Sequence, residues 1–235
     1  MLPLQPNEVE RLKALADLEV FGSPPEPQYD AICRTAQALF GVPIALVSLI
    51  SETEQWFKGK CGLDAPGTPR EVSFCTYTIL SDKVMVVDDA TYDERFAANP
   101  LVTGEPHIRF YAGAPLVLRP GIHLGSLCII DLVPRSFSRE QQEQLRNLAQ
   151  VIVALLRSGR AERDARESAA AYRLLADNST DVIIRSDLDG TRRYVSPAAR
   201  RLLGYEPREL LGTHPLAFVH PDEASAYARL LKQLG

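Results

Sequence analysis

The sequence predicts an α+β fold, an α/β sandwich in which helices at both ends of a domain cover a largely antiparallel sheet of five to six strands. Two segments with helical spacing open the chain, and five short apolar segments follow them. The turn Arg119–Gly121 joins the last two of these segments, and strands joined by a tight turn are antiparallel. A long helix then begins near Ser138.

The two leading helices are predicted from the spacing of their apolar residues. Val9, Leu12 and Leu15 recur at helical intervals, and a second stripe runs over residues 29–40. Cys33 belongs to that second stripe, so we expect a core residue there rather than a reactive thiol.

Five segments have the length and apolar character of β-strands. They are Pro43–Ser51, Glu54–Leu63, Val84–Asp88, Ile108–Leu118 and His123–Leu132. Between the second and the third, Glu71–Ser81 predicts a short helix.

Ser138 begins the third long helix with a capping box, in which its side chain and that of Gln141 each accept the other residue's backbone N–H. Apolar residues then recur at heptad-like intervals: Leu145, Leu148, Ile152 and Leu155. We expect this helix to leave the first domain and run into the Arg-rich second half. A packed helix followed by a flexible linker is the alternative.

A hairpin opens the second unit. Two short strands, 182–185 and 192–195, flank the turn Asp187–Gly190, where glycine can adopt the positive φ. Calcium binding by this turn is the alternative, but the further acidic ligands of a calcium loop do not follow it. Ser196 is expected to cap the next helix, and His220 to open the last one.

Composition excludes several classes of protein. The chain has 235 residues, 46% apolar and 24% charged, with a net charge of −4, which is typical of a globular protein and excludes a disordered one. The apolar runs 43–50 and 151–156 are far shorter than the ~20 residues that cross a bilayer. No secretory signal opens the chain. We therefore expect a cytoplasmic protein with no membrane contact.

Charge and cysteine content bear on the domain boundary, on nucleic-acid binding and on metal or disulfide content. Residues 1–155 carry a net charge of −6 and residues 156–235 one of +2, which predicts a boundary near residue 156. Neither part has the dense basic patch of a nucleic-acid-binding protein. The four cysteines and four histidines show no metal-ligand spacing and no Cys-x-x-Cys, so neither a metal nor a disulfide is predicted.

The first unit resembles a GAF domain over residues 7–157, of the subgroup found at the front of bacterial sensor histidine kinases and diguanylate cyclases. The motifs that carry the resemblance occur in the family's order: Gln55-Trp56-Phe57-Lys58, Ser73-Phe74-Cys75, Val87-Asp88-Asp89-Ala90, Asp93-Glu94-Arg95-Phe96, Asn99-Pro100-Leu101-Val102, Ile108–Leu116 and Leu124–Asp131.

The second unit resembles the front of a PAS domain. The matching motifs are Ala176-Asp177-Asn178, Asp181-Val182-Ile183, Asp187–Gly190, Tyr194–Ala198, Leu202–Tyr205 and Val219–Glu223. Two strands do not normally form a stable core alone, so we expect the remaining PAS strands to lie in a longer protein. The predicted division is a GAF domain over 1–157, a helical linker over 158–175 and the PAS part over 176–235.

The GAF resemblance implies a small-molecule pocket between the sheet and the helices and loops over its open face. The candidate ligand-binding residues are Trp56, Phe74, Cys75, Tyr77, Asp89, Arg109, Tyr111 and Cys128. Arg109 and Tyr111 are two residues apart on a strand and are expected on the same face. A guanidinium among apolar neighbours needs an anionic ligand or an acid such as Asp89. Residues 95–100 are expected to cover the pocket.

Known ligands of these families do not fit the residues. The combined Asn-Lys, Phe-Asp and Asp-Glu constellation of members that bind cyclic GMP is not present, and Thr76 follows Cys75 where members that attach a bilin have histidine. The Asn-Cys-Arg-Phe run of flavin photosensors is absent as well. His220, a conceivable haem ligand, is common in PAS sequences generally. The cofactor is therefore left open.

The resemblance implies a sensory module without catalytic activity. Ligand occupancy would shift the terminal helices and so act on the PAS part and on an output domain, a kinase or a diguanylate cyclase, outside this sequence. A parallel homodimer is expected through Val9, Leu12, Leu145, Leu148, Ile152 and Leu155. Two alternatives remain: a methionine sulfoxide reductase that uses Cys61, Cys75 and Cys128, and a ligand-free dimerisation module.

Overall fold

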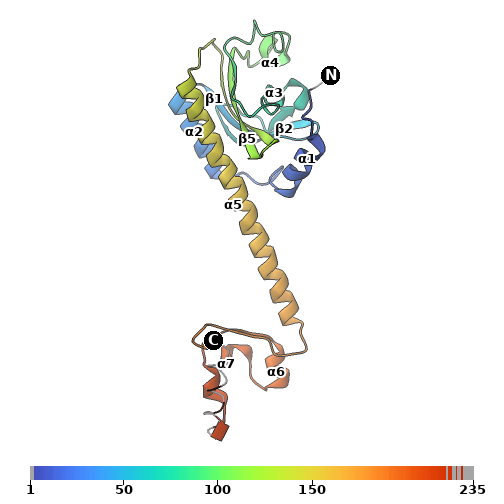
Figure 1. Cartoon of the computed structure of the whole chain (residues 1–235), viewed down its shortest axis with the longest axis vertical. Helices are drawn as coiled ribbons and strands as arrows, with labels where there is room; N and C mark the ends of the chain where they lie inside the picture. Colours follow the sequence, from blue (N-terminus) through green and yellow to red (C-terminus); the bar gives the residue numbers. More distant parts are fainter. Residues whose placement is uncertain (1–2, 221, 224–225, 227–228, 230–235) are drawn as a thin grey trace. The chain divides into compact units, whose positions relative to one another are not determined.

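The computed structural model describes residues 3–220, 222–223, 226 and 229, and the chain forms two compact units, Met1–Ala161 and Glu162–Gly235. Helix α5 begins in the first unit and continues into the second (Figure 1). Among the helices of the described residues, none combines the length and apolarity needed to cross a bilayer.

The first unit contains the predicted helices and strands with small shifts of their ends. Its helices are α1 (Glu8–Asp17), α2 (Pro27–Phe40), the 3₁₀ turn η1 (Arg70–Val72), α3 (Cys75–Thr78), α4 (Pro100–Thr103) and α5 (Arg139–Asp177). Its strands are β1 (Ile44–Ile50), β2 (Glu54–Cys61), β3 (Gly67–Pro69), β4 (Met85–Val87), β5 (Phe110–Arg119) and β6 (Ile122–Asp131). The short helix predicted over 71–81 is divided between η1 and α3.

The strands form one antiparallel sheet in the order β3-β2-β1-β6-β5-β4. The β5–β6 hairpin turns at Gly121, whose φ is 76°. Every residue of β1 is buried, because the sheet is covered on both faces. The predicted α+β sandwich is confirmed.

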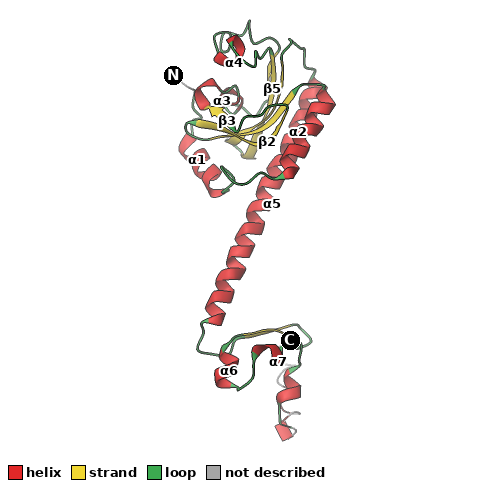
Figure 2. Ribbon diagram, turned by 180° about the vertical axis from the view of Figure 1, so that it is seen from behind, coloured by secondary structure: helices red, strands yellow, loops and turns green. Residues whose placement is uncertain are grey.

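Alternate residues of the central strands point into two separate cores. Ala45, Val47 and Leu49 of β1 pack with α1, α2 and α5, whereas Leu46 and Ile50 pack with α3 and the segment around α4. Figure 2 shows α2 and α5 side by side on one face of the sheet, with α3 and α4 on the other. The face under α3 and α4 holds the site described below.

The beginning of α5 confirms the capping box. Ser138 N–H donates to Gln141 Oε1 at 2.9 Å, and Gln141 N–H donates to Ser138 Oγ at 3.2 Å. A single helix of 39 residues follows, so the predicted continuous connector is found rather than a short helix with a flexible linker.

The predicted dimer stripe on α5 is wrong in two of its members. Leu145 and Ile152 are fully buried and pack against the sheet of their own chain. Leu148 and Leu155 are only partly buried beside that core. Heptad-like spacing predicts an apolar side of a helix but not its partner. Here Leu145 and Ile152 pack against the sheet of their own domain.

The second unit contains β7 (Ile184–Ser186), β8 (Arg192–Val195), α6 (Ala198–Leu202), α7 (Pro207–Leu210) and the 3₁₀ turn η2 (Pro215–Phe218). The predicted hairpin is confirmed, with Gly190 at φ 87°. Ser196 does not cap α6, because its hydroxyl accepts Ile183 N–H at 3.0 Å and so ties the helix start to the strand. Beyond His220 the described residues 222–223, 226 and 229 are helical, as predicted, and the other positions of the predicted last helix lie outside the described residues.

Candidate functional site

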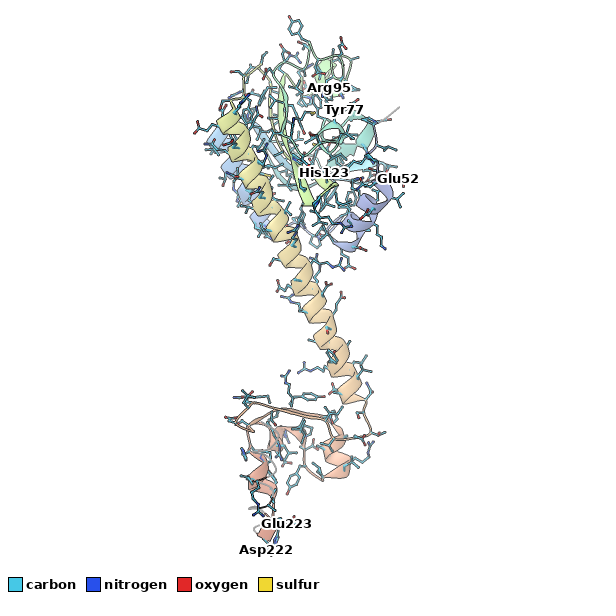
Figure 3. All side chains as sticks on the ribbon, in the orientation of Figure 1. Glu52, Tyr77, Arg95, His123, Asp222 and Glu223 are labelled. Atoms are coloured by element: carbon cyan, nitrogen blue, oxygen red, sulfur yellow. The ribbon has the colours of Figure 1, made fainter. Side chains whose placement is uncertain are left out.

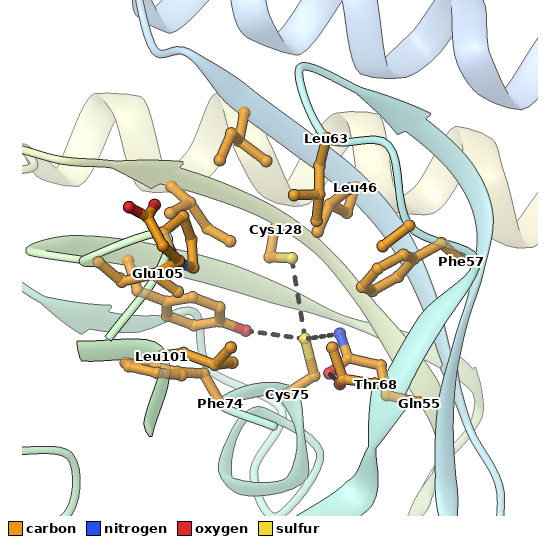
Figure 4. Close-up of a pocket in the computed structure, with 16 residues that line it drawn as sticks. Leu46, Gln55, Phe57, Leu63, Thr68, Phe74, Cys75, Leu101, Glu105 and Cys128 are labelled. Atoms are coloured by element: carbon orange, nitrogen blue, oxygen red, sulfur yellow. Dashed lines mark hydrogen bonds between the residues drawn. The ribbon is translucent and has the colours of Figure 1, made fainter. Parts of the chain in front are cut away.

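A cavity of about 360 Å³ lies between the sheet and the layer formed by α3, α4 and their loops. Its walls are mainly aliphatic and aromatic side chains from β1, β2, β5 and β6, including Leu46, Phe57 and Ile130. Leu101 of α4 closes one side (Figure 4). A concave apolar site with a few placed polar groups is typical of small-molecule binding.

The polar groups of the cavity converge on the sulfur of Cys75. Gln55 Nε2 donates to Cys75 Sγ at 3.2 Å, and the Tyr111 hydroxyl donates to it at 3.4 Å. Cys128 Sγ lies 3.7 Å away, and Figure 4 marks all three contacts. Four of the predicted ligand-binding residues, Phe74, Cys75, Tyr111 and Cys128, therefore line one cavity.

A second set of hydrogen bonds holds these donors in place. Thr68 Oγ1 donates to Gln55 Oε1 at 3.2 Å, and Gln55 Nε2 also donates to Ser48 Oγ at 2.7 Å. The hydroxyls of Thr78 and Tyr111 are 2.7 Å apart. Both donors to Cys75 are thus positioned without help from a ligand.

These hydrogen bonds move the pKa values of the two thiols in opposite directions. Burial raises the pKa of the Cys75 thiol, but hydrogen bonds with Cys128, Ser126, Tyr111 and Ser48 outweigh burial and bring the pKa below its ordinary value. The hydrogen bond to Cys75, followed by burial, raises the pKa of Cys128. The pair therefore favours a thiolate on Cys75 and a protonated Cys128.

The covering layer is held by local contacts that the sequence suggested. Asn99 caps α4 by accepting Leu101 N–H at 2.9 Å, while its Nδ2 donates to Val72 O at 3.0 Å beside η1. Phe96 stacks on Phe74 with ring centroids 3.9 Å apart. Residues 95–100 thus pack beside Phe74, while Leu101, directly after them, lines the cavity.

Trp56 and Tyr77 do not line the cavity. Trp56 pairs with Leu49 across the sheet, so its ring lies on the helix-covered face and packs against Phe21 at 5.5 Å. Tyr77 packs edge-on against Phe96, and the Arg95 guanidinium lies 5.9 Å from its ring (Figure 3). Trp56 therefore lies on the opposite face of the sheet from the cavity, whereas Tyr77 lies on the cavity side but packs into the covering layer.

Arg109 and Asp89 are also outside the cavity, and they do not form the ion pair that was one of the two expectations for Arg109. Arg109 Nη1 donates to the carbonyl oxygens of Val102 and Ile108, both at 3.0 Å. Asp89 Oδ1 accepts the backbone N–H and the hydroxyl of Thr91. Strand β5 begins at Phe110, so the two-residue alternation that placed Arg109 beside Tyr111 does not extend to it.

The fold agrees with the comparison to known proteins. A GAF domain is matched over residues 24–156, more than half of the chain. The chain belongs to the GAF family. A PAS fold is matched over residues 170–235, so the GAF domain is followed by a PAS domain.

One curated protein and two solved structures illustrate what the chain is similar to. A cyclic di-GMP phosphodiesterase of Pseudomonas aeruginosa is 39% identical over 189 residues, which cover 80% of this chain and 32% of the relative. The chain thus spans about a third of that relative's length. The GAF domain of a phosphoenolpyruvate-protein phosphotransferase from Coxiella burnetii is 18% identical, with a TM-score of 0.51, over 67% of this chain and 99% of that one. The corresponding Acinetobacter GAF domain is 16% identical, with a TM-score of 0.50, over 67% and 97%. Both share the fold.

Residues that the sequence reasoning missed complete the GAF cavity. Gln55 and Thr68 supply its polar groups, Leu101 and Glu105 its rim, and Phe57 part of its wall. The signal for Gln55 was available, because it alternates with Trp56 along β2 and so takes the opposite face. Thr68 and Glu105 lie in loops or at sheet edges, where no periodicity places a side chain.

Proposed function

We propose that this chain is the input part of a multidomain signalling protein, and that its GAF domain binds a small, largely apolar molecule. The observation that supports this proposal is the cavity over the sheet, whose walls are apolar and whose polar groups gather at Cys75. A preformed cavity of about 360 Å³ lies within the range of small-molecule sites.

The charges around the cavity favour a neutral or cationic ligand. Lys, Arg and His are absent from the described lining residues, and Glu105 is the carboxylate among them. The Glu105 side chain is 91% exposed at the rim. An anionic ligand such as a nucleotide would find no cation there to offset its desolvation. Neither cyclic GMP nor another phosphate ester is therefore proposed.

Strand β6 offers a route from the cavity to α5. Cys128 faces the cavity, while its neighbours Leu127 and Ile129 face the core that contains Leu145 and Ile152 of α5. The ligand site and the connecting helix are therefore separated by the thickness of one strand. We propose that ligand occupancy shifts β6 and so biases the packing of α5.

We retain the division into a GAF domain over 1–157, a helical linker over 158–175 and a PAS part over 176–235. In this proposal the chain is a non-catalytic cytoplasmic input module, and catalysis belongs to an output domain of the complete protein. The name of the 39% identical relative supports an output in cyclic di-GMP turnover rather than a histidine kinase.

A homodimer remains part of the proposal, with a corrected interface on α5. Leu148, Val151 and Leu155 follow one another at heptad spacing along a flank of α5 beside its buried residues, and Val151 is 50% exposed. Val9, at 85% exposed, and the half-buried Leu12 of α1 remain available as a flank. A second copy of the chain would cover this stripe.

Native mass spectrometry of the chain purified from its own cells tests the ligand proposal. We expect a retained small molecule in the wild type, and its loss in Leu46→Trp and in Ile130→Phe, because either larger side chain fills the cavity. Leu39→Trp, at an exposed position on α2, is the matched control. Thermal melts identify variants that fold. Folded cavity variants that keep the molecule, or a wild type that carries none, would overturn the proposal.

Reduction of methionine sulfoxide is the alternative function, and the contact between Cys75 and Cys128 favours it. Cys61 is apart from them, since its Sγ donates to Gln37 Oε1 at 3.2 Å on the α2 side. Turnover of free methionine sulfoxide with a dithiol reductant, lost in Cys75→Ser, would establish this activity. No turnover would exclude it.

A further inference from the structure

We propose that Cys75 is a site of reversible oxidation by small apolar hydroperoxides, and that Cys128 captures the oxidised sulfur as a disulfide at the base of the GAF cavity. The inference concerns the same cavity as the proposed function, but it depends on the two thiols and not on a resident ligand.

The two sulfurs are already in contact. Cys75 Sγ and Cys128 Sγ are 3.7 Å apart, and a disulfide bond requires about 2.05 Å. Cys128 is fixed on β6, which is hydrogen-bonded on both sides by β1 and β5. Cys75 is on α3, a helix of four residues beneath the covering layer. The closing movement therefore falls on α3.

Cys75 has the surroundings of a nucleophile, and Cys128 those of a resolving thiol. Gln55 and Tyr111 both donate hydrogen bonds to Cys75 Sγ, which stabilises a negative sulfur in an otherwise apolar site. The Tyr111 hydroxyl is itself held by Thr78. Cys128 Sγ contacts the same sulfur at 3.7 Å, and its hydrogen bond with Cys75, followed by burial, raises the pKa of the Cys128 thiol.

The cavity selects the oxidant. Cys75 is 1% exposed, so reagents reach its sulfur through the cavity and not from the surface. Leu46, Phe57 and Ile130 would surround the alkyl or aryl group of a hydroperoxide whose terminal oxygen points at Cys75. Charged thiol reagents lack that favourable burial and must lose their hydration to enter.

The hydroperoxide is the two-electron oxidant of the two thiols. The Cys75 thiolate attacks the terminal oxygen of R–O–O–H. The S–O bond forms, the O–O bond breaks, and the alkoxide leaves and takes up the proton that Cys75 released, giving Cys75–S–OH and R–OH. The Cys128 sulfur then attacks the sulfenic sulfur, and the hydroxyl leaves with the Cys128 proton as water. Two thiols lose two electrons in total, and the peroxide becomes an alcohol and water.

The remaining cysteines provide an internal comparison. Burial raises the pKa of the Cys33 thiol to about 12, so it is a poor nucleophile. Cys61 is half-buried and hydrogen-bonded to Gln37, away from the cavity. Oxidation at the cavity should therefore precede oxidation at either of them.

Peptide mass mapping of the full chain after treatment with one equivalent of cumene hydroperoxide tests the proposal. We expect a Cys75–Cys128 disulfide in the wild type and in the control Cys61→Ser, reversed by a dithiol. Cys128→Ser should stop at a Cys75 sulfenic acid that dimedone traps. Cys75→Ser and Cys75→Ala should leave Cys128 reduced. Cumene hydroperoxide should react about ten-fold faster than hydrogen peroxide, because its apolar group is buried in the cavity.

Three results would overturn the proposal: no disulfide in the wild type, equal oxidation in folded Cys75→Ser, or oxidation of Cys61 before Cys75. Failure here is distinguishable from failure of ligand binding. Native mass spectrometry of the untreated chain reports only the resident molecule, whereas the mapped disulfide reports only the thiols.

Discussion

Arg70 donates a hydrogen bond to Glu8 across 62 residues of sequence, with 2.6 Å between Nη1 and Oε1. The same carboxylate accepts Nε and Nη2 of Arg11 at 2.9 and 2.6 Å. Both arginines are buried, and Arg11 Nη1 also donates to the carbonyl of Ile50 at the end of β1. One carboxylate thus attaches α1 to β1 and to the η1–α3 segment that carries Cys75.

Removing that charge should destabilise the GAF domain strongly. Glu8→Gln leaves two buried guanidinium groups without their anion, and breaking a buried ion pair costs about 3–5 kcal/mol. Urea denaturation measures the loss. Glu10→Gln is the matched control, since Glu10 pairs with Arg119 on the surface and should change stability by less than about 1 kcal/mol. Equal effects of the two substitutions would contradict the assigned role of Glu8.

The same carboxylate predicts an acid-sensitive contribution to stability. Burial raises the pKa of Glu8, but hydrogen bonds and charge from Arg11 and Arg70 outweigh it and lower the pKa from 4.5 to about 2. A depressed native pKa stabilises the fold above the unfolded value, and that contribution disappears as the pH falls from about 4.5 toward 2. The difference in unfolding free energy between wild type and Glu8→Gln should narrow over that interval. A constant difference would contradict this account.

Tyr111→Phe should make Cys75 less reactive at neutral pH. The substitution removes one hydrogen-bond donor from Cys75 Sγ, so the pKa of that thiol rises and its alkylation rate shifts to higher pH. Mass-resolved alkylation with iodoacetamide across pH gives the profile of each cysteine. Tyr77→Phe is the control, because Tyr77 contacts Phe96 and not Cys75. The alkylation profile of Cys75 in this variant should match that in the wild type. Coincident profiles for all three proteins would exclude a role for the Tyr111 hydroxyl.

Val151→Glu should convert a dimer to a monomer. A carboxylate at the centre of the exposed stripe would be desolvated against its copy in a parallel helix pair. Gln150→Glu, at an exposed position on the other side of the helix from the stripe, should leave the association unchanged. Sedimentation velocity over a range of concentrations distinguishes the two. A monomeric wild type at high concentration would remove the dimer from the proposal.

The architecture was predictable where burial has a simple period. A short apolar run predicted β1 as a buried strand, and glycine in a short turn predicted the positive φ at Gly121. The capping box between Ser138 and Gln141 formed as its spacing indicated. These features depend on neighbours in sequence, which the sequence displays directly.

The missed site residues depended on information that is not local. Trp56 is among the residues expected at the pocket, but its partner Leu49 across the sheet determines its face. Arg109 was assigned by alternation, but its strand begins one residue later. Leu145 and Ile152 carry a pattern that fits a coiled coil and a domain core equally well, and only the tertiary packing separates these possibilities.

Helix α5 is unbroken, so the number of residues between two of its side chains sets their angle about the helix axis. Its 39 residues rise about 58 Å at 1.5 Å each, and every residue turns the helix by about 100°. Inserting one residue after Ala161 would therefore turn every later side chain by about a quarter of a circle relative to Leu145. Inserting seven would restore the orientation to within about 20°. Connector length in proteins of this design should therefore be constrained in steps of seven rather than by reach alone.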